Sequence, residues 1–439
     1  MRFFSSAKRG LYTRRLRTRR LYTRCFSSRR ATTTVAIHAG ESNLNENTHA
    51  SAPSLCLSTT FSVKEPLSFS ANELQESDPW CYTRWANPTV RQLEHKLAAL
   101  EGVEPGNAVA FASGMAASAA TMFSLLESGD HCVVSDTQYP GVAELFRDTL
   151  PRFGITATAV NSSDLANVVG AIVPGKTKLI WIETPANPIL RLTDISEAAV
   201  IAHGVGAELV VDSTFATPII TRPIVDHGAD FVIHSLSKYL CGHGDAIGGV
   251  VVGKSAARMQ RLRTEGAIHH GGVLSPFNAF LINRGIATLP MRMKAHSKGA
   301  TQVAEWLELQ VDNKNSLVSQ VTFPFLASHP QHALARRQMK MASGMISFQV
   351  DAGREEEVAS RFMKELQTIH YAVSLGHHRS LIYLLSTLDL AERDGSSYAL
   401  EGEQLLEYRE FAGNGVFRFS VGLEDPEDLI EDLARVLCK

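Results

Sequence analysis

Between residues 108 and 253, short apolar runs alternate with segments long enough to form helices, and this pattern constrains the fold more than any other feature of the sequence. Short apolar runs of this kind are typical of buried strands, and strands that alternate with helices form an α/β domain with a mainly parallel sheet. Ligands bind such sheets beyond the carboxyl ends of the strands. The six runs are AVAFAS, HCVVSD, KLIWIET, AELVVDST, DFVIHS and IGGVVVG, and the segments between them include MAASAATMFSLLES and GVAELFRDTL.

The rest of the sequence divides around this region. Residues 1–32 form a basic arm, and residues 33–90, rich in Ser, Thr, Asn and Pro, form an extended N-terminal arm. The stretch NPTVRQLEHKLAALEG at 87–102 predicts a helix with Asn as its cap, Pro in its first turn and Gly at its end. We expect a large domain over 91–290. Longer helical stretches and strands such as GMISFQV and GVFRFSVG then predict a smaller α+β domain over 291–439.

The N-terminal segment is strongly basic. Residues 1–30 carry ten arginines, one lysine and no acid, and the first carboxylate of the chain is Glu41. An Arg-rich, Ser-containing and acid-free composition is typical of an organelle transit peptide, so we expect a mitochondrial protein, with a plastid location as second choice. The alternative is a cytoplasmic protein in which a disordered basic arm stays attached.

The remainder of the chain is acidic. Without those eleven basic groups, 32 basic residues stand against 45 acidic ones, a net charge of −13, which argues against a nucleic-acid-binding role. No run approaches the roughly 18 uncharged apolar residues of a membrane helix, so we expect no membrane span. The six cysteines form no CxxC pair and no spacing that resembles a zinc site, so no metal is expected.

One motif is misleading. GAIVPGKT, residues 170–177, matches the phosphate-loop pattern G-x-x-x-x-G-K-[ST]. That chemistry requires a strand before the loop and a helix after it. Here a helix-like segment comes before and the strand KLIWIET follows at once, so we expect only a turn from helix to strand.

Residues that can carry chemistry lie at the ends of the predicted strands. FASGMAAS turns from strand into helix and so offers free backbone N–H groups that bind anions. An acid ends ELVVD, a tyrosine follows HCVVSDTQ, and two serines and a lysine follow DFVI in HSLSKYLCGHGDAIGG. Together they suit pyridoxal phosphate (PLP), which needs a Schiff-base lysine, an acid for the pyridine nitrogen and donors for the phosphate. The residues are Ser113, Gly114, Met115, Tyr139, Asp212, Ser235, Ser237 and Lys238.

From about residue 33 to its end the chain resembles the Cys/Met-metabolism family of fold-type-I PLP enzymes. The matching stretches, in order, are YTRWANPT, FASGM, ETPANP, VDSTFATP, HSLSKYLCGHGDAIGG and FRFSVGLEDPEDLIEDL. That family contains cystathionine γ-synthase, cystathionine β- and γ-lyases, methionine γ-lyase and homoserine sulfhydrylases. The resemblance implies the fold-type-I architecture, a large domain with a mainly parallel sheet and a smaller C-terminal α+β domain.

The resemblance also assigns roles toward the cofactor. Lys238 would form the internal aldimine, and Asp212 would pair with the pyridinium nitrogen and keep it protonated. Tyr139 would stack on the cofactor ring and exchange protons near the leaving group. The remaining cofactor contacts would come from Ser113, Gly114, Met115, Thr214, Ser235 and Ser237.

Toward the substrate, the resemblance implies that Arg418 clamps the α-carboxylate and that Asn187 assists it. For Asn187, as for Thr214, a purely structural role remains open. In this family Tyr82 and Arg84 reach the phosphate of the neighbouring subunit, which implies at least a homodimer, usually within a tetramer.

The chain departs from the family pattern at the distal pocket, where the reaction is selected. Relatives commonly read Y-G-G-T or Y-G-C-T at the stacking tyrosine, but this chain reads YPGVAELF, with Gly141 in place of the cysteine of methionine γ-lyases. Cystathionine γ-lyases carry an arginine where Glu144 falls and a glutamate where Arg379 falls. Either Glu144 and Arg379 are solvated surface groups, or they form a swapped ion pair at the substrate mouth.

Four further residues accompany these departures. Ser380, in SLGHHRSLIYLL, is expected to contact the substrate together with Glu144. His377 and His378 either tune the mouth of the pocket or face solvent. In GHGD, Gly244 stands where the family usually has Ser or Ala, which we expect to be a minor change.

The implied reaction starts when a substrate amine displaces Lys238 from the cofactor. The released amine, its pKa lowered by burial, removes the Cα proton, and a second proton shift lets the γ-substituent, or directly the β-substituent, leave. We therefore expect a carbon–sulfur lyase that catalyses γ-elimination on a small sulfur amino acid, cystathionine or methionine. The alternatives are γ-replacement of the cystathionine γ-synthase or O-acylhomoserine sulfhydrylase type, then β-elimination of cystathionine, and last a non-catalytic homologue.

Overall fold

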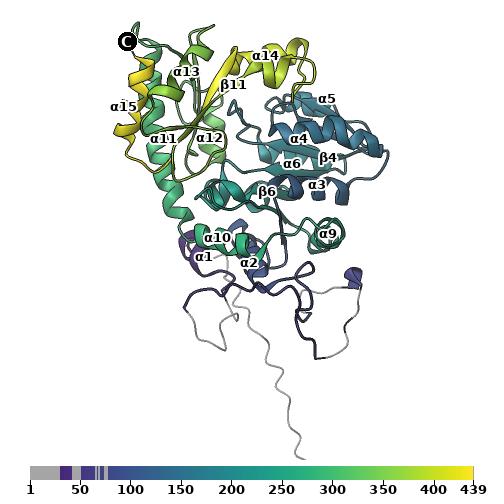
Figure 1. The fold of residues 1–439 in the computed structure, drawn as a ribbon. Coiled ribbons are helices and arrows are strands. Elements are labelled where there is room, and N and C mark those ends of the chain that lie inside the picture. The colour runs from purple at the N-terminus through teal and green to yellow at the C-terminus, as the bar shows by residue number, and fades with distance from the viewer. Residues whose placement is uncertain (1–29, 42–50, 65–66, 68–69, 74–77, 439) are drawn as a thin grey trace, which may run out of the picture.

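The computed structural model describes residues 30–41, 51–64, 67, 70–73 and 78–438. Nearly all of the predicted transit peptide, residues 1–29, lies outside these described residues. Figure 1 shows two sheets, each with its own helices, joined by the long helix α11 (Leu289–Val311). Helix α11 runs across the boundary that the sequence places at residue 290.

The larger sheet has seven strands in the order β1-β7-β6-β5-β4-β2-β3. Strands β2 to β6 pair in parallel, whereas β7 is antiparallel to both of its neighbours, so β1 points the same way as β6. The mainly parallel α/β fold predicted from the sequence is thereby confirmed. The strands are β1 (Ala108–Phe111), β2 (His131–Ser135), β3 (Thr156–Val160), β4 (Thr177–Glu183), β5 (Glu208–Asp212), β6 (Phe231–Ser235) and β7 (Gly249–Gly253).

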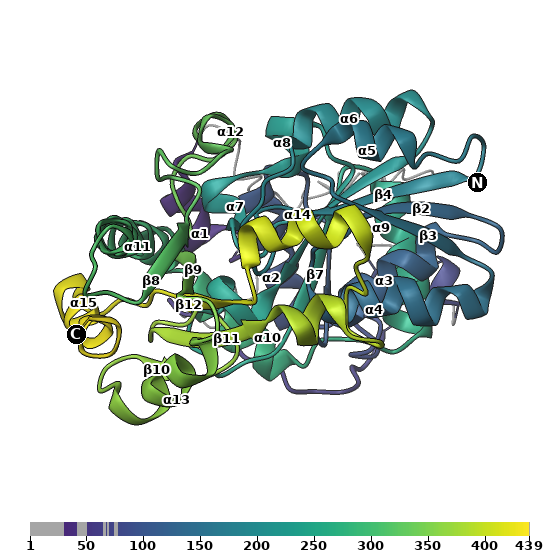
Figure 2. The ribbon, with the colours of Figure 1, turned by 90° about the horizontal axis from the view of Figure 1, so that it is seen from above.

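The strands of this sheet are apolar on both sides because helices cover both faces. In β4, Leu179 and Trp181 pack toward α3 (Gly114–Leu125) and α9 (Ala256–Leu262), while the alternate Ile180 and Ile182 pack toward α6 (Ile195–Gly204). Figure 2 shows the helices on the two sides of the strands. Strand β3 was not predicted, because its short sequence TATAV lies at the sheet edge and is largely exposed.

The local signals read from the sequence act as expected. Helix α2 (Pro88–Glu101) begins after Asn87, whose side chain accepts a hydrogen bond from the backbone N–H of Thr89, and ends at Gly102 with a φ of 82°. The phosphate-loop look-alike is a turn between α5 (Leu165–Gly170) and β4, as predicted. The other helical segments of this part are α1 (Thr32–His38), η1 (Ala71–Glu73), α4 (Pro140–Glu144), η2 (Leu145–Thr149), η3 (Leu150–Phe153), α7 (Thr217–Ile220), α8 (Pro223–His227), η4 (Leu236–Leu240), η5 (Arg263–His269) and α10 (Pro276–Ile286).

The smaller sheet has five strands in the order β10-β11-β12-β9-β8, all antiparallel except the β10–β11 pair. Its apolar residues, such as Phe348 and Phe417, pack against α11, α13 and α15, and Figure 1 shows α11 and α15 side by side. The elements are β8 (Val318–Thr322), α12 (His332–Gln338), β9 (Met345–Val350), α13 (Glu355–Glu365), β10 (His370–Tyr371), β11 (Leu381–Ser386), η6 (Leu388–Glu392), α14 (Gly402–Ala412), β12 (Gly415–Ser420) and α15 (Pro426–Leu437).

An apolar cluster joins the two parts of the molecule. Tyr408 and Ala412 of α14 and Val416 of β12 pack with Ile189, which follows β4 of the larger sheet. This contact holds the small sheet beside the carboxyl edge of the large one. In the described part of the chain, no helix is both long enough and apolar enough to cross a membrane.

Candidate active site

A cavity of about 880 Å³ lies at the carboxyl edge of the large sheet, where the small domain covers it. Eleven of the residues to which the sequence and the family resemblance assign a role toward cofactor or substrate line this cavity together. It is also lined by Glu183, Ser374 and His377, of which the first two were given no role from the sequence. The eleven are Ser113, Gly114, Met115, Tyr139, Asn187, Asp212, Thr214, Ser235, Ser237, Lys238 and Arg418.

One end of the cavity is suited to an anion. Helix α3 starts at Gly114, and its cap Ser113 accepts a hydrogen bond from the N–H of Ala116, so the first backbone N–H groups of the helix lie at the cavity. A Cβ on Gly114 would lie 3.3 Å from the Cβ of Ser235, a tight contact, so the lack of a side chain at Gly114 eases the close approach of the helix start to the end of β6. The hydroxyls of Ser235 and Ser237 complete a phosphate-sized cradle.

One threonine hydroxyl and one serine hydroxyl fix the segment that carries Ser235 and Ser237. Thr214 Oγ1 accepts a 2.9 Å hydrogen bond from the N–H of Ser235. Ser237 Oγ accepts from the N–H of Gly248 at 3.1 Å and lies 3.3 Å from the carbonyl of the same residue. Thr214 therefore has a structural role, and since it also lines the cavity, its contact with the cofactor stays a prediction.

The same cavity also holds a buried acid. Asp212, the last residue of β5, accepts a 2.9 Å hydrogen bond from the N–H of Thr214. Burial raises the pKa of Asp212, and its hydrogen bonds with Thr214 and the nearby His234 oppose that rise. A protonated pyridine nitrogen placed here would be stabilised by the Asp212 carboxylate and would stabilise it in return.

Lys238 lines the same cavity as the anion cradle and the acid. It interrupts the helical turn η4 with a φ of −94° and a ψ of −135°, and its Nζ donates a 2.8 Å hydrogen bond to Ser374 Oγ. Burial, reinforced by the positive charge of Arg418, lowers the pKa of Lys238 to about 8. About a tenth of an amine with this pKa is unprotonated, and so nucleophilic and proton-accepting, at pH 7, far more than for an ordinary lysine. The donors, the acid and the amine together fit PLP.

The lowered pKa of Lys238 predicts the pH profile of cofactor capture. Only the unprotonated amine reacts, so the rate at which apoenzyme combines with added PLP should rise with pH, reach half its maximum near a pH of about 8 and level off about one unit higher. A stopped-flow record of PLP absorbance between about pH 6.5 and 10 measures this profile, with Nα-acetyllysine as the reference amine of ordinary pKa. A rate that still climbs tenfold per unit beyond about pH 9, as for the reference amine, would contradict the prediction.

Arg418 is held ready for a carboxylate. It projects from β12, where its Nη1 donates to Asn187 Oδ1 at 2.9 Å and its Nη2 donates to the carbonyl of Ser374 at 3.1 Å. Its Nε is buried and has no hydrogen-bond partner among the described residues. A buried guanidinium N–H without a partner is costly, and the α-carboxylate of an amino acid would satisfy it.

Glu183, the last residue of β4, fixes two of the predicted site residues through their backbones. Its Oε2 accepts from the N–H of Tyr139 at 2.7 Å and its Oε1 accepts from the N–H of Asn187 at 2.8 Å. Burial, with the charge of Asp212 as the next cause, raises the pKa of Glu183 well above its usual range. The acid stands in the ETPANP motif, but nothing in the motif shows that its two oxygens bind separate loops.

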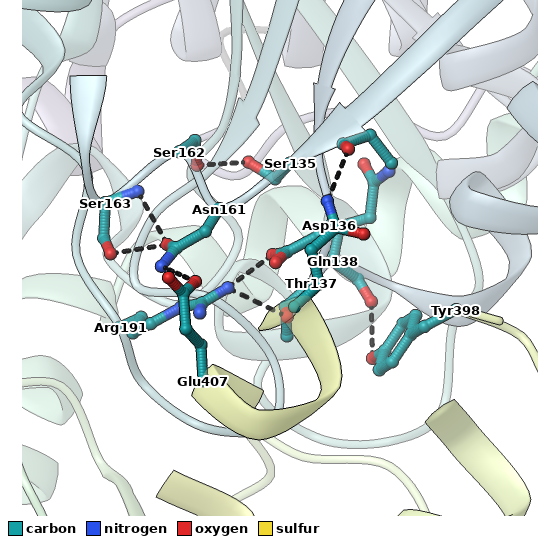
Figure 3. A network of polar contacts seen from close by, with 12 residues as sticks. Ser135, Asp136, Thr137, Gln138, Asn161, Ser162, Ser163, Arg191, Tyr398 and Glu407 are labelled. Atoms are coloured by element: carbon teal, nitrogen blue, oxygen red, sulfur yellow. Dashed lines mark hydrogen bonds and ion pairs between the residues drawn. The ribbon is translucent and has the colours of Figure 1, made fainter. Parts of the chain in front are cut away.

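A second polar network supports the segment that leads from β2 to Tyr139 (Figure 3). Arg191 forms a buried ion pair with Asp136 and donates to Thr137 Oγ1 at 3.1 Å. On the other side, the hydroxyl of Tyr398 lies 2.7 Å from the carbonyl of Gln138 and 3.0 Å from the carbonyl of Asn187. The small-domain segment before α14 thus fixes the loops that carry Tyr139 and Asn187.

Three predicted residues do not reach the cavity. Glu144 Oε1 accepts a 2.7 Å hydrogen bond from Ser397 Oγ, and Arg379 is exposed, so the swapped ion pair is not formed. Ser380 is fully buried because its hydroxyl and backbone N–H both donate to Glu424, at 2.9 and 2.8 Å. Glu144 and Arg379 are thus surface groups, the first of the two alternatives stated for them. None of the three residues lines the cavity, contrary to their assignment to the substrate.

Tyr82 and Arg84 do not line the cavity of their own chain. Arg84 Nη1 donates to the carbonyl of Ile268 at 3.0 Å, and the guanidinium lies 5.5 Å from the ring centroid of Tyr82. Tyr82 is 43% exposed. Their contact with the phosphate of a neighbouring subunit stays a prediction.

An α/β sheet with a low-pKa lysine, an anion cradle and a buried acid at its carboxyl edge defines a PLP-dependent enzyme. The chain belongs to the family described as Cys/Met metabolism PLP-dependent enzyme, whose model matches residues 33–438. This confirms the family, the fold type and the cofactor that the sequence motifs predicted.

Three relatives show how closely the chain follows known proteins. It is 42% identical, over 86% of its length and 92% of the relative, to a canavanine gamma-lyase of Pseudomonas canavaninivorans. It is 39% identical, over 92% of its length and 95% of the relative, to an O-succinylhomoserine sulfhydrylase of Pseudomonas aeruginosa. The solved structure of cystathionine gamma-lyase from Lactobacillus plantarum complexed with L-serine superposes with a TM-score of 0.78 and 33% identity, over 92% of this chain and 98% of that one.

Proposed function

We propose that this enzyme catalyses γ-elimination on an amino acid with a sulfur or oxygen substituent at Cγ, such as cystathionine or methionine. One observation carries the proposal: Lys238 and Arg418 line the same cavity. The pKa of Lys238 is lowered to about 8, and the buried Nε of Arg418 has no hydrogen-bond partner among the described residues. Lys238 can accept and donate protons, and Arg418 can bind the α-carboxylate of a substrate. Similarity to a canavanine gamma-lyase and a cystathionine gamma-lyase supports γ-elimination.

The residues divide the work as follows. Arg418 and Asn187 orient the α-carboxylate of the substrate, which places Cα near Lys238. PLP, when bound, supplies the electron sink that stabilises negative charge at Cα. Lys238 Nζ accepts the Cα proton and, once it has passed that proton on, can accept a proton from Cβ, so that the γ-substituent leaves with the electron pair of the Cγ bond. Asp212 would balance the positive charge of the cofactor ring. Tyr139 lies on the wall of the cavity, where its hydroxyl can exchange a proton with the leaving group.

The outer wall of the cavity accommodates the γ-substituent. It is largely apolar, with Val373, Ile247, Leu385 and Leu390. Gly141, which replaces the cysteine of methionine γ-lyases, lies beside Tyr139 and Met115. An apolar wall suits a thioether such as that of methionine or cystathionine. The second candidate, γ-replacement on an acylated homoserine, is supported by the similarity to the sulfhydrylase.

Product analysis tests the proposal. Holoenzyme is incubated separately with cystathionine, methionine, canavanine, and O-succinylhomoserine with or without sulfide, and the products are identified by mass spectrometry. We expect 2-oxobutyrate from cystathionine or methionine, or cleavage of the Cγ–O bond of canavanine with release of hydroxyguanidine. Pyruvate would instead indicate β-elimination, and homocysteine formed only with sulfide would indicate γ-replacement. No turnover by yellow, PLP-loaded protein would indicate a non-catalytic homologue.

We also propose that the active unit is a homodimer within a tetramer. The exposure of Tyr82 and its stacking with Arg84 leave both side chains available to a second subunit. Mixing inactive Lys238→Ala chains with inactive Arg84→Ala chains should restore activity to about a quarter of wild type if subunits exchange and sites are shared. We further propose that residues 1–32 direct the protein to mitochondria. Fusion of residues 1–32 to a fluorescent protein tests the location, with a plastid or the cytoplasm as the alternatives.

A further inference from the structure

A histidine that the proposed mechanism does not use lies in the cavity beside Lys238. The ring of His377 packs over Gly244, and both residues line the cavity. A Cβ on Gly244 would lie 2.6 Å from His377 Cε1 and 2.7 Å from Nδ1, closer than real atoms approach. The imidazole therefore occupies its place only because residue 244 has no side chain.

His377 is linked to the catalytic amine through one hydroxyl. Lys238 Nζ lies 2.8 Å from Ser374 Oγ, and Ser374 Oγ lies 3.4 Å from His377 Nε2. An ammonium group has only donors, so Ser374 Oγ accepts from Lys238, and the hydroxyl hydrogen is left to point at His377 Nε2. Ser374 itself is held in the left-handed region with a φ of 86°, so its side chain has a fixed origin.

The charged groups around His377 favour the neutral ring, which this arrangement needs. Burial is the main cause that lowers the pKa of His377, and the charge of Lys238 and the adjacent His378 add to it, while Asp245 opposes it. The charge of Arg418, which faces Lys238, acts on the lysine. A neutral imidazole with its proton on Nδ1 offers Nε2 as an acceptor to Ser374.

We propose that His377 is a positioning residue that holds the Ser374 hydroxyl as an acceptor toward the Lys238 amine, and that Gly244 is the residue that admits the ring. In this arrangement the amine is held in one orientation when it is free to take the Cα proton. The inference rests on the proposed function only for the role of Lys238 in proton transfer. Its first test uses apoenzyme and PLP alone, so it can fail or succeed whichever substrate the enzyme takes.

The first test changes the acceptor while it keeps the bulk of the side chain. In His377→Leu the Ser374 hydroxyl loses its acceptor, so its oxygen accepts less strongly from the Lys238 ammonium. The midpoint of the pH profile for PLP capture should fall by about half a pH unit. His377→Gln, which keeps an acceptor oxygen, and the control His378→Leu, on the next residue outside the cavity, should keep the wild-type midpoint. Equal midpoints in all four proteins would overturn the proposal.

Steady-state kinetics of the holoenzyme give the second readout. His377→Leu should lower kcat about threefold to tenfold with little change in KM, because Arg418 and Asn187 still bind the carboxylate. His377→Gln should recover most of the loss. A rise in KM with kcat unchanged would mean that the ring contacts the substrate and does not orient Ser374.

The role of Gly244 is tested by a double-mutant cycle. Gly244→Ala adds a Cβ against the ring, so it should displace His377 and reproduce the kinetic defect of His377→Leu, together with the backbone strain of a φ of 72°. In a His377→Gly background only the strain remains, so the same substitution should cost clearly less. Equal effects in both backgrounds would show that Gly244 does not make room for the ring. Thermal unfolding and PLP content of each variant separate loss of folding from loss of function.

Discussion

Replacement of Lys238 by alanine is expected to lower kcat by about 10³-fold or more, because it removes the group that moves the Cα proton. The anion cradle and Asp212 remain in this variant, so the protein should still fold and bind PLP noncovalently. Its visible spectrum should therefore change, whereas its thermal unfolding should stay close to that of the wild type. Steady-state assays with the best substrate from product analysis measure the loss.

The matched control for this substitution is Lys254→Ala, which removes an exposed lysine just after β7. It should retain wild-type turnover. If Lys238→Ala kept a tenth or more of the activity, another base would have to take the Cα proton, and the assignment of Lys238 would be wrong.

Replacement of Glu183 by glutamine is expected to lower kcat/KM about tenfold to a hundredfold. The carboxylate uses one oxygen for the N–H of Tyr139 and the other for the N–H of Asn187. An amide has one oxygen, so its NH₂ group would face one of these N–H groups and displace the loop that carries it. Loss of one buried hydrogen bond with an unsatisfied donor costs about 1–3 kcal/mol, which corresponds to this loss of rate.

Glu144→Gln is the control, since Glu144 follows Tyr139 closely in the chain but bonds Ser397 away from the cavity. It should keep kcat/KM within about twofold of wild type. Glu183→Asp separates the two roles, because it keeps both oxygens but not the reach. Wild-type kinetics for Glu183→Gln would mean that the positions of Tyr139 and Asn187 do not depend on this acid.

The cofactor end of the site could be predicted from the sequence, because its residues follow strand ends directly. Once the apolar runs are assigned to one sheet, Asp212, Ser235 and Lys238 must meet at its carboxyl edge, since each lies within three residues of a strand. The same reasoning found the turn at Ser113 and the helix after it. Here local patterns determine the geometry.

At the substrate end, Arg418 and Asn187 were predicted only through the family resemblance, and the residues around them could not be predicted, because this end is built by contacts between distant segments. Arg418 meets Asn187 across 231 residues, and Glu144 meets Ser397 across 253. A charge swap that reads as an ion pair in the sequence is not one in the structure, because Arg379 stays exposed and Glu144 finds a hydroxyl instead. The close fit of His377 to Gly244 depends on a missing methyl group and is visible only in three dimensions.

The reversed direction of β7 has a consequence for altering this enzyme. A link between parallel strands must cross a face of the sheet, usually as a helix. Because β7 is antiparallel to β6, the link between them starts and ends at the same edge of the sheet. The N–H of Leu236 donates a 2.9 Å hydrogen bond to the carbonyl of Gly248, which joins the two ends of this link. Both ends of the link at 236–248 therefore lie at the active-site edge, and its residues Ser237, Lys238 and 244–247 line the cavity. Residues 245–247 of this link line the cavity, so exchanging them is expected to reshape the substrate entrance while the strand ladders, Gly244 and Lys238 remain in place.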